Sequence, residues 1–257
     1  MVIISQRLKK IANKILPNSK LADIGSDHAL LPTYLAQKNI IQMAVAGEVN
    51  KGPYEAAKKQ VENSNLQHMI QVRLGNGLEV LDKEEVDTIV IAGMGGGLIT
   101  DILNHSYDYT GVKRLVLQPN VAEDKVRRWC IQNHWQLIEE DILEEDRKIY
   151  EILVAERSEN AYEESNEQIF SEEMYEWNCD CHIQLTRKLK ILMGPHLLNN
   201  PSPVFIKKWN REIAKREKVI EQLSQSNLEE AVHKKSEFSA EVDQLKEVLK
   251  CLQRDKQ

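Results

Sequence analysis

The chain lacks any apolar run approaching the ~18 residues that a membrane-spanning helix needs. We expect no signal peptide either, because the apolar stretch in MVIISQRLKK is short and comes before the basic residues instead of after them. The 42% hydrophobic and 29% charged residues are the proportions of an ordinary globular protein. We therefore expect a cytoplasmic protein that makes no contact with a membrane.

Cysteine is sparse as well, with four residues in 257. Two of them lie in the run Cys179-Asp180-Cys181-His182, which resembles half of a metal site. No second pair follows at zinc spacing, and the segment has a helical pattern. We therefore predict reduced thiols and no metal.

An overall excess of positive charge is also missing. The net charge of -6 argues against nonspecific binding of polyanions. The charge is unevenly distributed, however: residues 1–20 contain five basic residues and no acid, whereas residues 156–176 contain eight glutamates. An acidic chain of this kind can still present one basic face.

The first 157 residues alternate short apolar runs with helical patterns. The spacing predicts strands at 20–24, 43–47, 69–74, 86–92, 113–118, 136–142 and 149–155. It predicts helices at 3–16, 29–38, 52–64, 96–105 and 121–133. Five β-α units followed by a hairpin indicate an α/β fold with a mostly parallel, seven-stranded, Rossmann-like sheet. Such sheets bind ligands at the carboxyl ends of their strands.

The pattern changes after Arg157, so we expect one domain at 1–157 and a helical domain at 158–257. Gly194-Pro195 ends one helical pattern, and NNPSP at 199–203 predicts a loop. Two apolar stripes at a/d spacing follow: Trp209, Ile213, Ile220 and Leu223, interrupted by Arg216, and then Phe238, Val242, Leu245, Leu249 and Leu252. They predict an antiparallel coiled-coil hairpin.

The first candidate strand runs into the turn LADIGSDHALLP, residues 21–32. A dinucleotide-binding turn requires G-x-G-x-x-G, but this register supplies Gly25, Asp27 and Leu30. The carboxylate of Asp27 would repel phosphate, and a P-loop is excluded because no G-K-[ST] follows. S-adenosylmethionine carries a sulfonium and an ammonium and no phosphate, so it is compatible with an acidic turn.

Three later strands also end in polar or glycine-rich segments. Glu48 follows Gly25 by 23 residues, an interval at which an acid can accept ribose hydroxyls. Asn76 is placed to contact an adenine edge, and VIAGMGGGL, residues 90–98, lets backbone approach a ligand. Each signal has a plain alternative: a structural turn, a surface carboxylate or a flexible loop. Their order at successive strand ends favours a ligand site.

These segments together resemble the TrmK family, bacterial tRNA methyltransferases that modify N1 of adenine 22. The matching runs are DIGSDHALLP, GEVNKGP, RLGNGLEV, IAGMGGGLI, LVLQPN and ILEEDRKIYEILVAE, and the resemblance extends to MGPHLL and FIKKW. Two positions depart from the family pattern, where Asp often stands at Asn76 and an aromatic residue at Leu30. We assign S-adenosylmethionine contacts to Asp23, Gly25, Asp27, Glu48, Val49, Asn76, Gly77, Gly93, Met94 and Gly95.

The implied reaction needs little acid–base catalysis, because adenine N1 is a neutral nucleophile that can attack a sulfonium methyl directly. In-line approach and stabilisation of charge are the main requirements. We predict Asp27, His28 and Asn120 as the catalytic group, with Gln118 beside Asn120 on the adenine edge. The alternatives are that Asp27 and Asn120 only cap helices and that His28 only packs.

Basic residues beside aromatic ones are candidates for binding tRNA, since such pairs grip phosphates and stack bases. Trp129 and Trp209 each have such neighbours, although both tryptophans could instead pack in a core. The predicted tRNA contacts are Arg7, Lys9, Lys10, Lys125, Arg127, Arg128, Lys207 and Lys208.

The sequence leaves three other functions open. One is methyl transfer to another RNA position or to a small molecule, and another is a non-catalytic scaffold built on the helical hairpin. A nicotinamide-dependent dehydrogenase is disfavoured by the missing glycines and by Asp27. The oligomeric state is not fixed by the sequence.

Overall fold

The computed structural model describes residues 1–105, 107–157, 185–225 and 228–254. The chain forms two compact units, Met1–Met174 and Tyr175–Gln257. The point at which one unit passes into the other lies outside the described residues, so a domain boundary at residue 157 stays a prediction.

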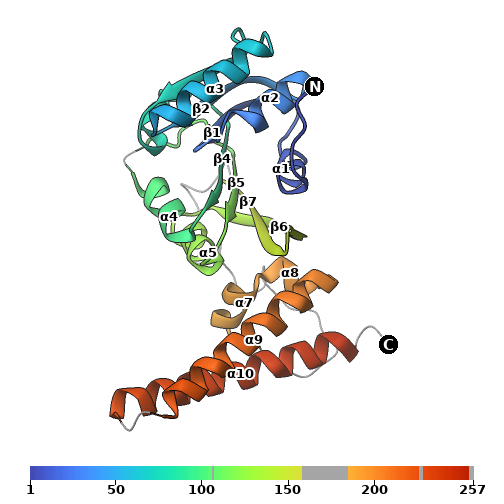
Figure 1. Cartoon of the computed structure of the whole chain (residues 1–257), viewed down its shortest axis with the longest axis vertical. Coiled ribbons are helices and arrows are strands. Elements are labelled where there is room, and N and C mark those ends of the chain that lie inside the picture. Colours follow the sequence, from blue (N-terminus) through green and yellow to red (C-terminus); the bar gives the residue numbers. More distant parts are fainter. Residues whose placement is uncertain (106, 158–184, 226–227, 255–257) are drawn as a thin grey trace. The chain divides into compact units, whose positions relative to one another are not determined.

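The first unit is built on one seven-stranded sheet, in the order β3-β2-β1-β4-β5-β7-β6 (Figure 1). The first five strands pair in parallel, and β7 is antiparallel to both β5 and β6. This arrangement confirms the predicted α/β sheet and its terminal hairpin. The strands are β1 (Ser19–Ile24), β2 (Ile41–Glu48), β3 (Ile70–Leu74), β4 (Thr88–Met94), β5 (Arg114–Pro119), β6 (Gln136–Glu145) and β7 (Lys148–Glu156).

Helices flank this sheet and account for its parallel pairing, because each crossover returns the chain to the same end (Figure 1). They are α1 (Gln6–Ala12), α2 (Leu30–Gln37), α3 (Lys51–Asn63), α4 (Gly96–Asn104) and α5 (Glu123–Gln132), with a short 3-10 helix, η1 (Gly77–Val80). The first helix is shorter than the predicted 3–16. Its start is fixed by Ser5, whose hydroxyl accepts the N–H of Leu8.

The core lies where β1 runs between β2 and β4. Leu21, Ala22 and Ile24 of β1 are at most 2% exposed, and Ile89, Val90 and Ile91 of β4 are fully buried. A strand buried on both faces has a continuous apolar sequence instead of an alternating one. The apolar stretch stops at the carboxyl ends of these strands, where the chain leaves the core. The polar residues predicted to bind a ligand begin there.

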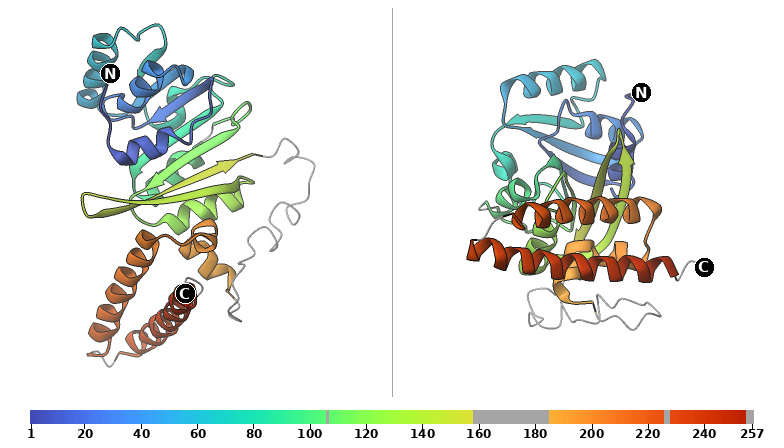
Figure 2. Two further views of the ribbon diagram at one scale, coloured as in Figure 1. Left: turned by 90° about the vertical axis from the view of Figure 1, so that its right-hand side faces the viewer. Right: turned by 60° about the horizontal axis from the view of Figure 1, so that its bottom comes forward.

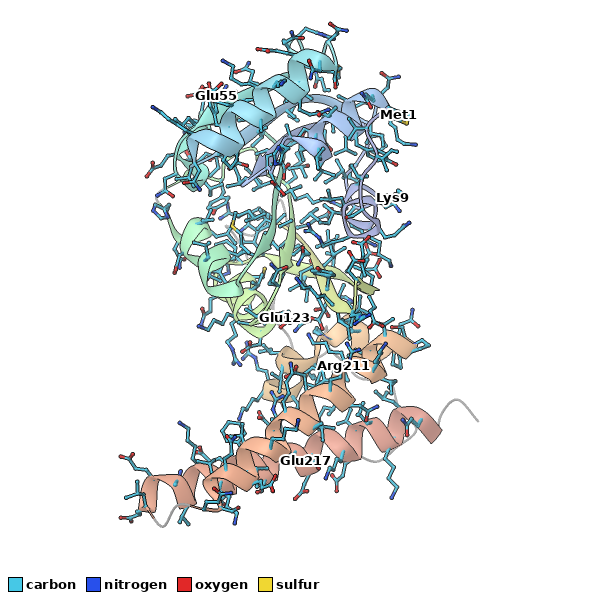
Figure 3. All side chains as sticks on the ribbon, in the orientation of Figure 1. Met1, Lys9, Glu55, Glu123, Arg211 and Glu217 are labelled. Atoms are coloured by element: carbon cyan, nitrogen blue, oxygen red, sulfur yellow. The ribbon has the colours of Figure 1, made fainter. Side chains whose placement is uncertain are left out.

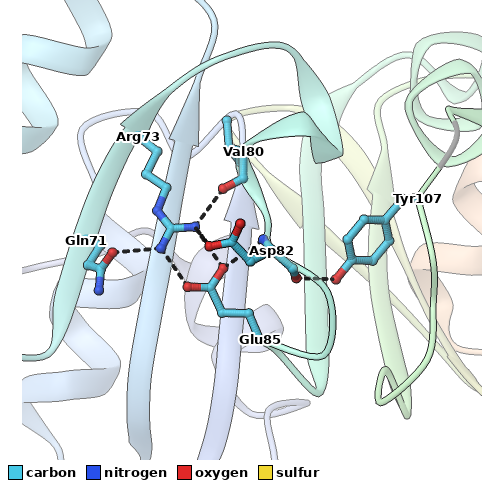
Figure 4. A network of polar contacts seen from close by, with 6 residues as sticks. All are labelled: Gln71, Arg73, Val80, Asp82, Glu85 and Tyr107. Carbon is cyan, nitrogen blue, oxygen red and sulfur yellow. Dashed lines mark hydrogen bonds and ion pairs between the residues drawn. The ribbon is translucent and has the colours of Figure 1, made fainter.

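A network around Arg73 fixes the segment that follows β3 (Figure 4). Its guanidinium donates to the backbone oxygen of Val80 at 2.8 Å and to both carboxylate oxygens of Glu85 at 2.7 and 2.6 Å. Burial raises the pKa of Glu85, but the bonds from Arg73 outweigh it, so the pKa lies below its usual value. This network holds η1, and with it Asn76 and Gly77, against the end of β3.

A buried ion cluster joins α5 to the β6–β7 hairpin, which Figure 2 shows as a long antiparallel pair. Arg127 is 1% exposed; its Nε donates to Glu140 at 2.5 Å, and its Nη2 donates to Glu151. The side chains of Glu140 and Glu151 are fully buried. Burial opposes the charge of Arg127, but the two carboxylates outweigh burial and raise the pKa of the guanidinium.

The second unit contains α7 (Arg187–Met193), α8 (Pro195–Asn199), α9 (Pro203–Leu223) and α10 (Glu229–Arg254). The helices α9 and α10 pack against each other, as the two apolar stripes predicted (Figure 2). Arg216, which interrupts the first stripe, is 17% exposed and spans the pair, since its Nε lies 3.2 Å from Glu241 of α10. None of the described helices is long and apolar enough to cross a membrane.

The cysteines differ from the prediction at one position. Cys130 is a buried free thiol, as expected. Cys251 in α10 is disulfide-bonded, so the prediction of reduced thiols is wrong for that residue. The run Cys179-Asp180-Cys181-His182 lies outside the described residues.

The buried cluster gives a direct test of the fold. Arg127→Met removes the cation between Glu140 and Glu151 and leaves two buried carboxylates without it, which we expect to cost about 3–5 kcal/mol. Thermal unfolding should shift down by roughly 2–4 °C for each kcal/mol. The matched control is Arg128→Met, because Arg128 is partly exposed and pairs only across one helical turn with Asp124. Equal melting temperatures in the two variants would contradict the assignment.

Candidate functional site

The carboxyl ends of β1, β2, β4 and β5 lie side by side at one edge of the sheet. Backbone hydrogen bonds there join β1 to β2 and β4 to β5. The N–H groups of Gly25 and Ser26, after β1, donate to the backbone oxygen of Gly47 in β2. The N–H of Asn120, after β5, donates to the backbone oxygen of Met94 in β4 at 2.7 Å. Four of the segments predicted to bind the cofactor and the acceptor base are therefore neighbours in the structure.

The turn after β1 has an unusual backbone. Asp27, His28 and Ala29 all have positive φ angles, of 39°, 67° and 52°. Asp and His enter this left-handed region more readily than most residues, but three in succession are strained. The helix α2 begins at Leu30 with Ala29 as its N-cap and no side-chain cap. The alternative in which Asp27 caps this helix is therefore wrong.

The side chains of this turn face solvent at the strand edge. Asp27 is 82% exposed and His28 is 54% exposed, and His28 Nε2 lies 3.4 Å from Asp27 Oδ1. The carboxylate of Asp27 is therefore available to a cationic ligand.

Glu48, at the end of β2, closes the turn from the neighbouring strand. Its Oε1 accepts the N–H of Asp27 at 2.6 Å, and the residue is 6% exposed. Burial raises the pKa of its carboxyl, and the hydrogen bond from Asp27 partly offsets that effect. The carboxylate thus has a structural task in addition to the ribose contact predicted for it.

Asp23, the last polar residue inside β1, is almost fully buried and accepts the hydroxyl of Ser26 at 2.5 Å. Burial raises the pKa of Asp23 to about 7, and the nearby carboxylate of Glu48 adds to the rise. The positive charge of Arg7 acts in the opposite direction.

The segments after β3 and β4 supply exposed backbone. Asn76 is exposed and precedes η1 without bonding to it through its side chain, and Gly77 takes a φ of 56°. Gly25 takes a φ of 70°, a left-handed conformation that favours glycine, and the end of the Met94 side chain occupies the space where a Cβ would lie. Gly93, Met94 and Gly95 form the end of β4 and the start of α4, while Val49 is 59% exposed after β2.

Asn120 and Gln118, at the end of β5, have different roles. Asn120 is exposed, and its Nδ2 donates to the backbone oxygen of Gly93 at 2.6 Å. It does not cap α5, whose N-cap is Ala122. Gln118 is fully buried and donates to Pro119 O at 2.9 Å and to Asn120 Oδ1 at 3.1 Å. The prediction that Gln118 contacts adenine is wrong, because its amide is already bonded inside the protein.

Arg7 belongs to this site as well, which the sequence did not reveal. Its Nη1 donates to Gln118 Oε1 at 2.5 Å, and its guanidinium lies 5.5 Å from the centre of the Tyr150 ring. The sequence predicts Arg7 as a tRNA contact in a basic helix, whereas the structure turns it toward Gln118. No spacing signal could have found the contact, because 111 residues separate Arg7 from Gln118.

The basic first helix is largely neutralised by acids of β6. Lys10 Nζ lies 2.5 Å from Asp141, and Lys14 pairs with Glu139 and Asp141. Glu145 accepts the N–H of Gln6 at 2.6 Å. Lys9 has none of the described hydrogen bonds or ion pairs and points away from the sheet (Figure 3).

The other predicted tRNA contacts divide into three groups. Arg127 is wrong as a tRNA contact, because it is buried between Glu140 and Glu151. Lys125 is exposed and Arg128 is partly exposed, so both keep a surface position on α5. Lys207 and Lys208 lie on α9 of the second unit. Trp129 and Trp209 are 5% and 2% exposed, which confirms the alternative that they pack in cores.

The composition of the site determines which ligand it suits. Asp23, Asp27 and Glu48 place three carboxyl groups around one turn, which repel phosphate and favour an ammonium or sulfonium. Within the described residues, no group of three His, Cys, Asp or Glu side chains is arranged to hold a metal ion.

A sheet of this order, with an acidic single-glycine turn after its first strand, defines a Rossmann-like class I methyltransferase. The chain belongs to the TrmK family, whose model, tRNA (adenine(22)-N(1))-methyltransferase, matches residues 21–247.

Curated and solved relatives agree with this assignment. The tRNA (adenine(22)-N(1))-methyltransferase of Bacillus subtilis (strain 168) is 40% identical over 250 residues, which cover 96% of this chain and 97% of that protein. The crystal structure of B. subtilis TrmK, described as an m1A22 tRNA methyltransferase, covers 97% of this chain and 100% of its own, with 39% identity and a TM-score of 0.84. A putative tRNA (m1A22) methyltransferase of Streptococcus pneumoniae, solved with S-adenosyl-L-methionine, covers 96% and 100%, with 37% identity and a TM-score of 0.78.

The raised pKa of Asp23 predicts pH-dependent binding of S-adenosylmethionine. A pKa near 7 leaves this carboxyl mostly protonated at pH 6, and we expect a cationic ligand to bind the ionised form more tightly. Affinity measured by calorimetry should therefore be about tenfold weaker at pH 6 than at pH 8, because a group with this pKa is roughly one-tenth ionised at pH 6 and roughly nine-tenths ionised at pH 8. Asp23→Asn should remove this dependence, whereas the same pH profile in both proteins would show that Asp23 does not control binding.

Proposed function

We propose that this protein transfers a methyl group from S-adenosylmethionine to N1 of an adenine in tRNA, at position 22 as in its named relatives. The observation that carries the proposal is the pairing of an exposed carboxylate with an exposed amide at one sheet edge. Asp27 lies after β1, and Asn120 lies two strands away, after β5. The first suits a cationic methyl donor, and the second suits a base edge.

The cofactor supplies an electrophilic methyl group, and the protein has to hold the two partners in line. Glu48 and the turn that it closes are suited to the ribose and the ammonium, because carboxylates accept hydroxyl hydrogens and attract cations. Asn76 and Val49, which follow β3 and β2, are suited to the adenine of the cofactor. No residue needs to remove a proton before attack, since N1 presents a lone pair in the ring plane.

Asn120 is suited to the acceptor adenine. N1 must stay free to attack, so recognition falls on the neighbouring exocyclic amino group. After its bonds with Gln118 and Gly93, the amide of Asn120 keeps one lone pair on Oδ1 and one hydrogen on Nδ2. The lone pair can accept a hydrogen from the amino group and stabilise the positive charge that the ring gains.

The tRNA has to be gripped outside this pocket, and its adenine has to leave the base stack, at a cost of a few kcal/mol. The remaining candidates for phosphate contacts are Lys9, Lys125, Arg128, Lys207 and Lys208. Such contacts make affinity fall as salt rises. We place the reaction in the cytoplasm, where tRNA is the available substrate.

Methyl transfer to unmodified tRNA tests the activity. Purified protein, labelled S-adenosylmethionine and an unmodified transcript should give 1-methyladenosine after nuclease digestion, identified by mass. A transcript in which adenine 22 is replaced should accept no label. Label on that second transcript would indicate another position, and transfer to neither RNA would contradict the proposal.

The charge of Asp27 gives a sharper test. Asp27→Asn keeps the size of the side chain and suits the left-handed φ, because Asn also enters this region. It removes only the charge, so thermal stability should change little. We expect methyl transfer to fall at least about tenfold, or about 1.4 kcal/mol. A loss of affinity for S-adenosylmethionine would place the carboxylate at the ammonium, and a loss of turnover alone would place it near the methyl group.

Asp146→Asn is the matched control, since Asp146 is an exposed carboxylate with a left-handed φ of 50° in the turn between β6 and β7, and this change should leave methyl transfer unaltered. Normal affinity and normal turnover in Asp27→Asn would remove Asp27 from the site.

A further inference from the structure

Four groups form one continuous line of hydrogen bonds from α1 to the end of β4. Arg7 Nη1 donates to Gln118 Oε1 at 2.5 Å, and Gln118 Nε2 donates to Asn120 Oδ1 at 3.1 Å. Asn120 Nδ2 then donates to the backbone oxygen of Gly93 at 2.6 Å. We call these four groups, Arg7, Gln118, Asn120 and Gly93 O, the amide relay.

The direction of the amide relay is fixed by its two ends. A guanidinium can only donate hydrogen bonds, and a backbone oxygen can only accept them. Arg7 therefore requires the oxygen of Gln118 to face it, which turns the Gln118 nitrogen toward Asn120. Gly93 requires the nitrogen of Asn120 to face it, which turns the Asn120 oxygen toward Gln118. Neither amide can flip without breaking a bond at both of its atoms.

The side-chain amide of Gln118 makes its hydrogen bonds inside the protein. It is 0% exposed, and its second N–H donates to the backbone oxygen of Pro119 at 2.9 Å. All of its hydrogens and one lone pair of its oxygen are used inside the protein. Asn120 is the exposed member, so the relay ends at the side chain that faces the substrate edge.

Contacts with β6 and β7 hold Arg7 in position. Glu145 accepts the N–H groups of Gln6 and Arg7 at 2.6 and 3.2 Å, and Lys10 pairs with Asp141 at 2.5 Å. Tyr150 lies under the guanidinium, with the ring centre 5.5 Å from Cζ. The helix α1 is thereby held on the β6–β7 hairpin with its arginine turned toward β5.

We propose that Arg7 is a positioning residue for methyl transfer, which acts through Gln118 to hold the Asn120 amide with its oxygen and nitrogen in fixed places. The inference rests on the proposed function, in which Asn120 receives the amino group of the acceptor adenine. An inverted Asn120 amide would present N–H to that amino group and repel it. Arg7 therefore controls whether the base sits productively, without touching it.

Two variants separate this role from binding of phosphate and from anchoring of α1. Arg7→Met keeps an unbranched side chain but has no donor, so Gln118 is free to turn. We expect kcat to fall roughly tenfold or more, because a small misplacement of a reacting group has an effect of that order. At pH 9, where Asp23 stays ionised even without the charge of Arg7, the KM for tRNA and the Kd for S-adenosylmethionine should stay within about threefold. Arg7→Lys, which can only donate, should recover much of the lost turnover.

Gln118→Glu is the second variant. A carboxylate still accepts from Arg7 and keeps α1 anchored, but it has no N–H for Asn120. We expect kcat to fall as in Arg7→Met. The melting temperature should also fall, because the new carboxylate faces the oxygens of Pro119 and Asn120, so turnover is the measurement that tests the relay. Lys59→Met is the charge control, since Lys59 is an exposed cation on α3 with none of the described ion pairs. It should match the unmodified protein in every measurement.

Two outcomes would overturn the proposed role of Arg7. A rise in KM for tRNA with unchanged kcat in Arg7→Met would make Arg7 a phosphate contact, as its basic neighbours first suggested. A lower melting temperature in Arg7→Met together with normal kcat in Gln118→Glu would make Arg7 only an anchor for α1. Failure of the unmodified protein to methylate tRNA would refute the proposed function instead, so the two failures are distinguishable.

Discussion

The parallel pairing of β1 with both β2 and β4 is the constraint on which the site depends. Ile24, at the end of β1, lies opposite Gly47 of β2 and Ile91 of β4, so β1 ends beside the end of β2 while β4 runs on to Met94. The chain then leaves the sheet through a strained turn, which Glu48 holds by accepting the N–H of Asp27. Without that carboxylate, three consecutive left-handed residues would lack their bond to the neighbouring strand.

The carboxyl groups at this edge of the sheet are costly to ionise, and a cationic ligand offsets that cost. Burial raises the pKa of Asp23 to about 7, and it also raises the pKa of Glu48, so both carboxyl groups are held in surroundings that disfavour their charge. A cation placed beside them reverses that penalty. The same arrangement explains why a phosphate-bearing dinucleotide is a poor occupant, although the sheet resembles those that bind dinucleotides.

Charge also determines which basic residues remain available to RNA. The acids of β6 pair with Lys10 and Lys14, and two glutamates surround Arg127, so much of the positive charge near α1 and α5 stabilises the fold. Arg7 is turned toward Gln118 instead of solvent. A cluster of basic residues in a sequence is therefore a weak indication of a nucleic-acid surface when acidic strands lie elsewhere in the chain.

The sequence by itself determined the seven strands, their order along the chain and the acidic turn, because apolar periodicity and glycine chemistry are local properties. It also placed Asp27, Glu48 and Asn120 at one edge of the sheet, since Glu48 ends β2, Asn120 follows β5, Asp27 lies shortly after β1, and parallel strands end at one edge. Only the tertiary structure decided that Arg127 is buried, that Gln118 is consumed and that Arg7 enters the site. The decisive contacts join Arg127 to Glu140, 13 positions away, and Arg7 to Gln118, 111 positions away, and no local pattern records which donor will meet which acceptor across such distances.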